Sequence, residues 1–443
     1  MVWPMSTGEA IAIRGLRGNS IALMATTHVA ALLGYVFWLL CARWFSAGVI
    51  GISNTLISAM TLVAILAVAG FIPMLTRLLP GASGEERSGL CSTAFVITVF
   101  VSGLTGVGAA FLMPERVGVA VGTVWMAVFA STGAMGTALM LVSNAALLGV
   151  RRAELSLLGM AVGSIARLIA VAAILMLGLV AADADASAIH TILGVWVASL
   201  WISSVLSIGL LARATPGFRF LPGALWFSRL RCSAAWDHIA MVALRAPALA
   251  LPIIAAVHLP PAEVGYLVVV VMIASAFLAV PGAVSSALLA DCADDPGRLR
   301  AQSRHAARLM AILLVVPVLI AAVLARDVLS LFGAGYAHYS VLLILLLISA
   351  FPDALINLAL TALRVQSRLR AVAVVTAAGA VITIGGTWVL IPHMGAFGAA
   401  AALLTSQAIV ATILALMVFG AAGHDGYAGH GGARTRRAWV GWR

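Results

Sequence analysis

Arg245 is the residue whose chemistry stands out, because it lies inside a long apolar segment, residues 234–257. A guanidinium group stays protonated and binds phosphate through two parallel hydrogen bonds, which suits a phosphate ligand. The residue lies about eleven positions into the segment, close to the middle of a membrane-spanning helix at ~1.5 Å per residue. Charges at that depth are costly, which makes them candidates for function. The alternative is a purely structural ion pair between Arg245 and Asp353.

Five other polar residues of the apolar segments are candidate binding residues. His28 lies at a similar depth in segment 18–42, although a single histidine there also suits a packing role. Asp353 and Asn357 are one helical turn apart and follow a proline. They could serve as a counter-ion and a hydrogen-bonding ligand for the substrate. Alternatively, they mark a helix kink whose freed backbone groups are hydrogen-bonded locally. Asn54 and Asn144 support the same interpretation more weakly.

Arg167 is a further charge within a span, and we expect an ion pair or a helix–helix contact within the first half of the chain. The chain has no lysine, which excludes a Walker A loop and a lysine Schiff base. Its four cysteines have no metal-binding spacing. Asp183-Ala-Asp185 resembles a metal-binding DxD motif but lies in a short loop. We therefore expect no catalytic residue, no metal and no cofactor.

The composition is that of a membrane protein. The chain is 63% hydrophobic and 9% charged, with a mean hydropathy of +1.13. So few charges cannot cover a soluble surface of this size. The net charge of +11 matches connections that face anionic lipid, so we expect no nucleic-acid partner.

The arginines alternate between connections. One set of connections holds 21 of the 26 arginines, and the other set holds only Arg43, Arg116 and Arg326. Because positive charge is retained on the cytoplasmic side during insertion, this alternation predicts twelve spans with both termini cytoplasmic. The predicted spans are 18–42, 49–76, 89–113, 118–148, 155–181, 188–212, 234–257, 262–289, 306–325, 339–361, 371–391 and 395–420.

The chain also repeats itself. Gly51 and Gly265 open corresponding spans 214 residues apart, and Gly149 and Arg364 mark corresponding turns 215 apart. Six spans per half predict two lobes related by a pseudo-twofold axis along the membrane normal. The expected parts are an N-terminal lobe 1–212, a cytoplasmic linker 213–233, a C-terminal lobe 234–420 and a disordered tail 421–443. The aromatic and arginine-rich linker suits either an interfacial helix or a plain connection.

Six segments in order resemble the multidrug/oligosaccharidyl-lipid/polysaccharide exporter superfamily. They are ARWFSAGVIG (42–51), AGFIPMLTRLLP (69–80), LLGVRRAELSLLG (147–159), LPPAEVGYLVVVVMIASAF (259–277), LSLFGAGYAHYSVLLILL (329–346) and IPHMGAFGAAAALL (391–404). The resemblance implies two six-helix lobes around a central cavity that opens to each side in turn. It also places the seventh span, with Arg245, on the cavity wall.

The resemblance narrows to O-antigen and capsule-type polysaccharide flippases. Drug exporters of the superfamily often carry a carboxylate in the first span, and segment 18–42 has none. Lipid II flippases carry arginines there and two additional spans, which this chain lacks. The resemblance implies a flippase for a lipid-diphosphate-linked oligosaccharide or polysaccharide precursor in the bacterial cytoplasmic membrane, with membrane lipids and glycan-assembly enzymes as partners. The alternatives are a cation-coupled multidrug exporter, a membrane glycosyltransferase or polymerase, and a non-transporting scaffold for glycan assembly.

Overall fold

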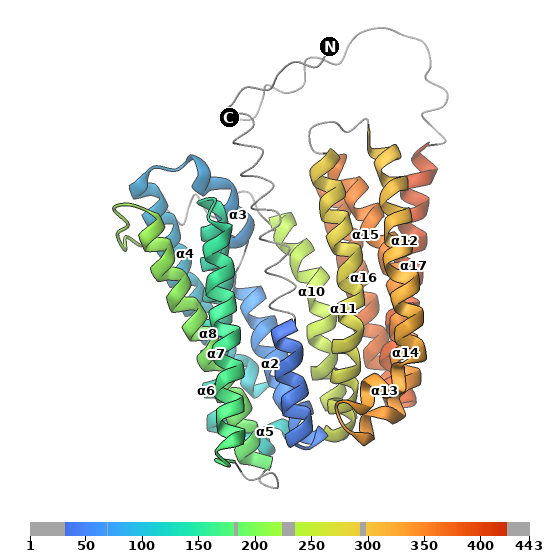
Figure 1. The fold of residues 1–443 in the computed structure, drawn as a ribbon. Helices are drawn as coiled ribbons and strands as arrows, with labels where there is room; N and C mark the ends of the chain where they lie inside the picture. The colour runs from blue at the N-terminus through green and yellow to red at the C-terminus, as the bar shows by residue number, and fades with distance from the viewer. Residues whose placement is uncertain (1–31, 69, 181–184, 224–234, 293–297, 423–443) are drawn as a thin grey trace.

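The computed structural model describes residues 32–68, 70–180, 185–223, 235–292 and 298–422, and within these ranges the chain forms helices and turns without a strand. Eleven of the described helices are long and apolar enough to cross a membrane. A shorter apolar helix, Leu32–Trp44, covers the described part of the first predicted span. The helices form two groups side by side (Figure 1). The predicted fold class, an all-α multi-pass membrane protein with two lobes, is confirmed.

The N lobe contains the helices that precede the linker. Gly70 (φ 84°) and Gly122 (φ 85°) adopt left-handed backbone angles that favour glycine, and they divide the second and fourth spans into two helices each. The N-lobe helices are Leu32–Trp44, α2 (Ala47–Ala67), α3 (Phe71–Leu78), α4 (Gly84–Phe111), α5 (Glu115–Val121), α6 (Thr123–Gly149), α7 (Ala153–Met176) and α8 (Asp185–Ala214).

The C lobe contains the helices that follow the linker. Its tenth span is interrupted at Ser349, just before Pro352, and Pro281 lies inside one long helix. The C-lobe helices are α10 (Ala235–His258), α11 (Pro261–Cys292), α12 (Leu299–Val323), α13 (Ala325–Ser330), η3 (Ala334–Tyr339), α14 (Ser340–Ile348), α15 (Ala350–Val365), α16 (Leu369–Met394) and α17 (Ala396–Ala422). Helix α10 packs against α16 within this lobe and against α2 of the N lobe.

The linker is described over residues 213–223; its first two residues end α8, and residues 215–223 are not helical. The backbone amides of Arg219, Leu221 and Gly223 donate hydrogen bonds to hydroxyl groups of α4, at 3.2, 3.2 and 3.0 Å. Alternate residues therefore face the same helix, as in an extended chain. This segment is a docked connection, while the rest of the proposed interfacial helix, 224–234, lies outside the described residues.

Two turns at corresponding positions of the lobes share an unusual local structure. Arg151, between α6 and α7, and Ser367, between α15 and α16, are the non-glycine residues with positive φ in the described chain, at 60° and 58°. In both turns the next residue donates its amide to the carbonyl five positions back, of Leu147 or of Leu363, at 2.9 Å. This is the Schellman motif that ends a helix. Its presence at both positions supports the internal repeat, whose symmetry axis stays a prediction.

The molecule has two chemically different ends. We call the end with the connections around Arg77, Arg151 and Arg364 the arginine-rich end. The opposite end, with α5 and α13, is the arginine-poor end (Figure 1). The connections with Arg43 and Arg116 belong to the arginine-poor end.

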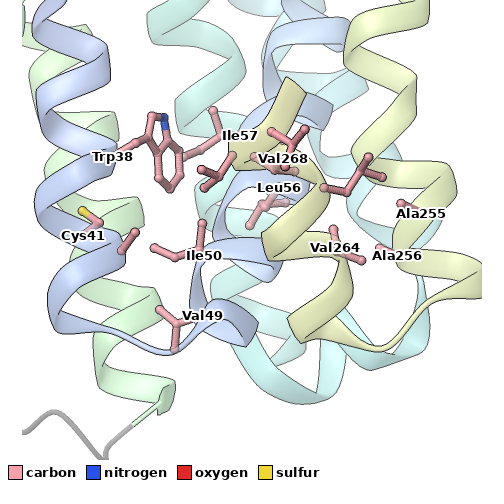
Figure 2. Close-up of a cluster of buried hydrophobic side chains, with 14 of the residues drawn as sticks. Trp38, Cys41, Val49, Ile50, Leu56, Ile57, Ala255, Ala256, Val264 and Val268 are labelled. Atoms are coloured by element: carbon pink, nitrogen blue, oxygen red, sulfur yellow. The ribbon is translucent and has the colours of Figure 1, made fainter. Parts of the chain in front are cut away.

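Among the described residues, the buried apolar core is shared between the lobes at the arginine-poor end. There one cluster combines Trp38, Ile50 and Leu56 of the N lobe with Ala255 and Val264 of the C lobe (Figure 2). Toward the arginine-rich end, the described buried residues form separate clusters, one within the N lobe and two within the C lobe. Apolar burial stabilises association in proportion to buried area, so it holds the lobes together at the arginine-poor end, while the described clusters at the other end stabilise each lobe separately.

Candidate functional site

A cavity of about 330 Å³ opens between α10, α15 and α16, toward the arginine-rich end of the C lobe. Its wall combines two guanidinium groups, one carboxylate, an indole ring and apolar side chains. The lining residues are Trp236, Asp237, Ala240, Met241, Leu244, Arg245, Arg364, Leu369 and Val372. Arg245 therefore lies on a cavity wall, and a second arginine from another helix accompanies it.

The geometry of α10 and α15 places these charges on the cavity. Asp237, Met241 and Arg245 follow one another at four-residue intervals, so they lie on one face of α10. Their eight-residue span covers about 12 Å of helix. Arg364 is half-buried in the last turn of α15, where the helix dipole favours a cation. Two cations from different helices thus face one space.

The carboxylate of the cavity is paired with an arginine of the other lobe. Nη2 of Arg77, from α3, lies 2.5 Å from Oδ2 of Asp237. At the rim, the guanidinium of Arg370 lies 5.8 Å from the ring centre of Trp236, within cation–π range. The carboxylate is neutralised by this pair, which leaves Arg245 and Arg364 as the excess positive charge of the cavity.

Asp353 and Asn357 form a local pair on α15. Nδ2 of Asn357 donates to Oδ2 of Asp353 at 2.9 Å and to its backbone carbonyl at 3.0 Å. Both residues are half-buried and neither lines the cavity. Among the described residues, no ion pair joins Asp353 to Arg245. The one-turn spacing therefore brings Asp353 and Asn357 into direct contact. The carboxylate that accompanies Arg245 on the cavity wall is Asp237.

The candidate residues of the N lobe lie away from this cavity. Asn54 is half-buried on α2 and accepts a hydrogen bond from a serine one turn later, at 3.3 Å. Asn144 is buried on α6, and its side-chain oxygen has no partner in the described part of the chain. The buried guanidinium of Arg167 lies 4.0 Å from the ring centre of Trp196 and 5.3 Å from that of Phe37, a contact between helices of one lobe. His28 lies outside the described residues.

Sequence reasoning missed Asp237, Arg364 and Trp236 as site residues. Arg364 was counted with the arginine-rich connections, so it was not considered as a residue that lines a cavity. Asp237 and Trp236 precede the middle of their span by more than two turns. The available signal was the four-residue spacing from Asp237 to Arg245, which predicts a shared helix face.

At the arginine-poor end the lobes touch closely. A Cβ atom on Gly265 of α11 would lie 2.7 Å from the carbonyl carbon of Ala47 in α2, and one on Gly51 would lie 2.8 Å from the amide nitrogen of Gly265. Tyr35 and Phe332 make an edge-to-face ring contact across the same boundary, with centroids 5.5 Å apart. The two repeat-related glycines therefore meet each other, and their lack of side chains permits the approach.

Two of the three arginines at this end also bridge the lobes. Nη1 of Arg116 donates to the carbonyl of Leu259 at 3.1 Å, and Nε of Arg43 donates to the carbonyl of Leu331. Both donors belong to the N lobe and both acceptors to the C lobe. Two of the three exceptions to the arginine asymmetry thus contribute to the contact between the lobes.

Solved transporters have the same arrangement of helices. The lipid II flippase MurJ in an inward closed conformation matches with a TM-score of 0.72 and 12% identity, covering 90% of this chain and 87% of that chain. An inward-facing multidrug resistance MATE family transporter of the MOP superfamily matches with a TM-score of 0.64 and 13% identity, covering 93% and 100%. The chain shares their fold. No protein-family model and no curated protein matches it by sequence.

A further solved transporter also shares the fold. An outward-facing MATE family transporter of the MOP superfamily matches with a TM-score of 0.53 and 14% identity, covering 93% of this chain and 97% of that chain. The inward-facing structure gives the higher score.

Proposed function

We propose that the protein is a flippase that moves a lipid-diphosphate-linked oligosaccharide or polysaccharide precursor from the inner to the outer leaflet of the bacterial cytoplasmic membrane. The observation that carries the proposal is the C-lobe cavity with Arg245 and Arg364 on its wall. The arginine-rich end is assigned to the cytoplasm, with both termini and the linker, because arginine is retained on that side.

The two guanidinium groups suit the chemistry of the proposed substrate. A diphosphate that links a lipid to a sugar keeps a negative charge on each phosphate, and these charges must cross an apolar layer. Arg245 and Arg364 offer planar donors that bind phosphate oxygens in pairs and do not lose their protons. Residues 1–212 and 234–420 act as the two lobes, joined by linker 213–233, and their rocking exposes the site to each side in turn.

The similarity to MATE transporters supports the multidrug-exporter alternative. Neither the fold nor a cluster of catalytic residues supports the enzyme alternative. Small cationic drugs would meet an excess of positive charge at Arg245 and Arg364. Like charges in a partly enclosed space repel. The cavity thus favours an anionic substrate over a cationic drug.

Replacement of Arg245 tests the proposal. Arg245→Ala leaves the protein in the membrane but stops export, so the lipid-linked glycan accumulates on the inner leaflet. Arg245→Lys recovers part of the export, because the charge remains while the planar fork is lost. The measurements are the membrane content of the protein and the leaflet distribution of the lipid-linked glycan in cells.

Arg308→Ala is the matched control, since this arginine is exposed on α12 and does not line the cavity. It should export normally. A structural role for Arg245 predicts loss of folded protein instead of loss of export. Full export by Arg245→Ala at normal protein level would refute the proposed function.

A further inference from the structure

At the arginine-rich end, where the described residues form no apolar core shared by the lobes, the lobes make a charged contact. Arg77 extends from α3 of the N lobe to Asp237 on α10 of the C lobe, with 2.5 Å between nitrogen and oxygen. The side chains are 53% and 26% exposed. Partly exposed ion pairs contribute little to stability, so this one can form and break at small cost.

The same carboxylate belongs to the wall of the cavity. Asp237 lines it together with Arg245 and Arg364, and it acts electrostatically on Arg364. One oxygen of Asp237 therefore faces the N-lobe arginine while the residue remains a neighbour of the C-lobe cations. The charge available to a ligand in the cavity depends on which of these partners neutralises Asp237.

The charge of the site consequently depends on the contact between the lobes. With Arg77 in place, three guanidinium groups surround one carboxylate, and the excess is two positive charges. If the ends of α3 and α10 separate, Asp237 is left with the two cavity arginines, and the excess falls to one. A diphosphate linked at both ends carries two negative charges, so its electrostatic match is better in the first state.

We propose that Arg77, from the opposite lobe, sets the anion affinity of the C-lobe cavity by neutralising Asp237, and so couples substrate binding to the contact between the lobes. This inference rests on the proposed function and adds a residue that does not touch the cavity. Arg77 acts through Asp237 and is a positioning residue. By linkage, a diphosphate that binds better when Arg77 is paired also stabilises the pair to the same extent.

Binding of inorganic pyrophosphate to the purified full-length protein tests this coupling. Arg77→Gln should weaken binding by roughly tenfold or more, because an unneutralised carboxylate remains in the cavity. Asp237→Asn should bind at least as well as the wild type. The double variant should bind like Asp237→Asn alone, because without the carboxylate there is nothing for Arg77 to neutralise. Isothermal titration calorimetry at constant ionic strength gives the four dissociation constants.

Arg152→Gln is the matched control, because Arg152 is as exposed as Arg77 and pairs with Glu154 at the same end of the molecule, at 3.3 Å, but away from the cavity. It should bind like the wild type. Arg77→Lys should restore most of the affinity, since the positive charge alone neutralises the carboxylate. A general loss of folding predicts the opposite pattern, with the double variant weaker than either single variant.

The outcomes separate this inference from the proposed function. If the wild type binds pyrophosphate, Arg245→Gln abolishes binding and Arg77→Gln has no effect, the coupling is wrong and the phosphate site stands. If the double variant stays as weak as Arg77→Gln, the coupling is also wrong. If the wild type does not bind pyrophosphate, both ideas are refuted.

Discussion

Gly265→Ala should shift the equilibrium between the two arrangements of the lobes. The added Cβ would collide first with the carbonyl oxygen of Ala47, and it would lie 2.7 Å from the carbonyl carbon, which is about 0.7 Å inside ordinary van der Waals contact. The opposing atoms belong to the backbone of α2 and cannot rotate away. Overpacking of this kind costs about 1–3 kcal/mol.

This cost applies only while the lobes touch at the arginine-poor end. The arrangement in which they separate there is unaffected, so the equilibrium should shift toward it by about 5–150-fold. Spin labels at Val119 on α5 and Met394 on α16, both exposed at this end, report the separation by electron–electron distance measurements. The wild type should give mainly short distances, and Gly265→Ala should add a population of longer ones.

Gly282→Ala is the matched control, because Gly282 lies in the same helix and a Cβ there meets nothing within 4 Å. It should keep the wild-type distances. Gly48→Ala, one turn from Gly51, offers a second control at the interface itself, with its nearest contact at an ordinary 3.6 Å. If Gly265→Ala gives the same distances and thermal stability as Gly282→Ala, the close approach of α2 and α11 does not hold the lobes.

Two further predictions concern the same architecture. Arg116→Met removes the donor to the Leu259 carbonyl, so it should weaken the arginine-poor contact by about 1 kcal/mol and increase the long-distance population, whereas Arg326→Met should not; equal effects of the two variants would argue for general charge loss. For topology, a cysteine at Gly81 should resist a membrane-impermeant maleimide in intact cells while one at Ala337 should react, and labelling of Gly81 from outside would overturn the assignment of the ends.

The positions of the membrane spans were predictable from sequence, because they depend on the length and hydropathy of each segment alone. Each apolar segment satisfies its own backbone hydrogen bonds as a helix, so length and hydropathy suffice to locate the spans. The departures are breaks within spans, at Gly70, Gly122 and Ser349, where the chain starts a new helix. The repeat offset paired Gly51 with Gly265, but it did not show that the two residues touch.

Local spacing also accounted for part of the polar structure. The four-residue interval from Asp353 to Asn357 predicts neighbours on one helix face, and their side chains are hydrogen-bonded. Arg245 was recognisable as an unusual charge because a single residue in an apolar segment is visible without knowledge of its surroundings. Whether Arg245 pairs with Asp353 could not be decided from the sequence. The two residues belong to different helices, and no local pattern specifies how these helices are rotated relative to each other.

The sequence by itself determined which segments are helices and how the two ends of the molecule differ in charge, because hydropathy and arginine content are properties of each segment alone. Only the tertiary structure decided that Arg364 shares a cavity with Arg245, that Arg77 crosses between lobes to Asp237, and that the core is continuous at one end. These contacts join residues far apart in the chain. They depend on how whole helices pack, which is a cooperative outcome of many side chains and is not encoded in any one segment.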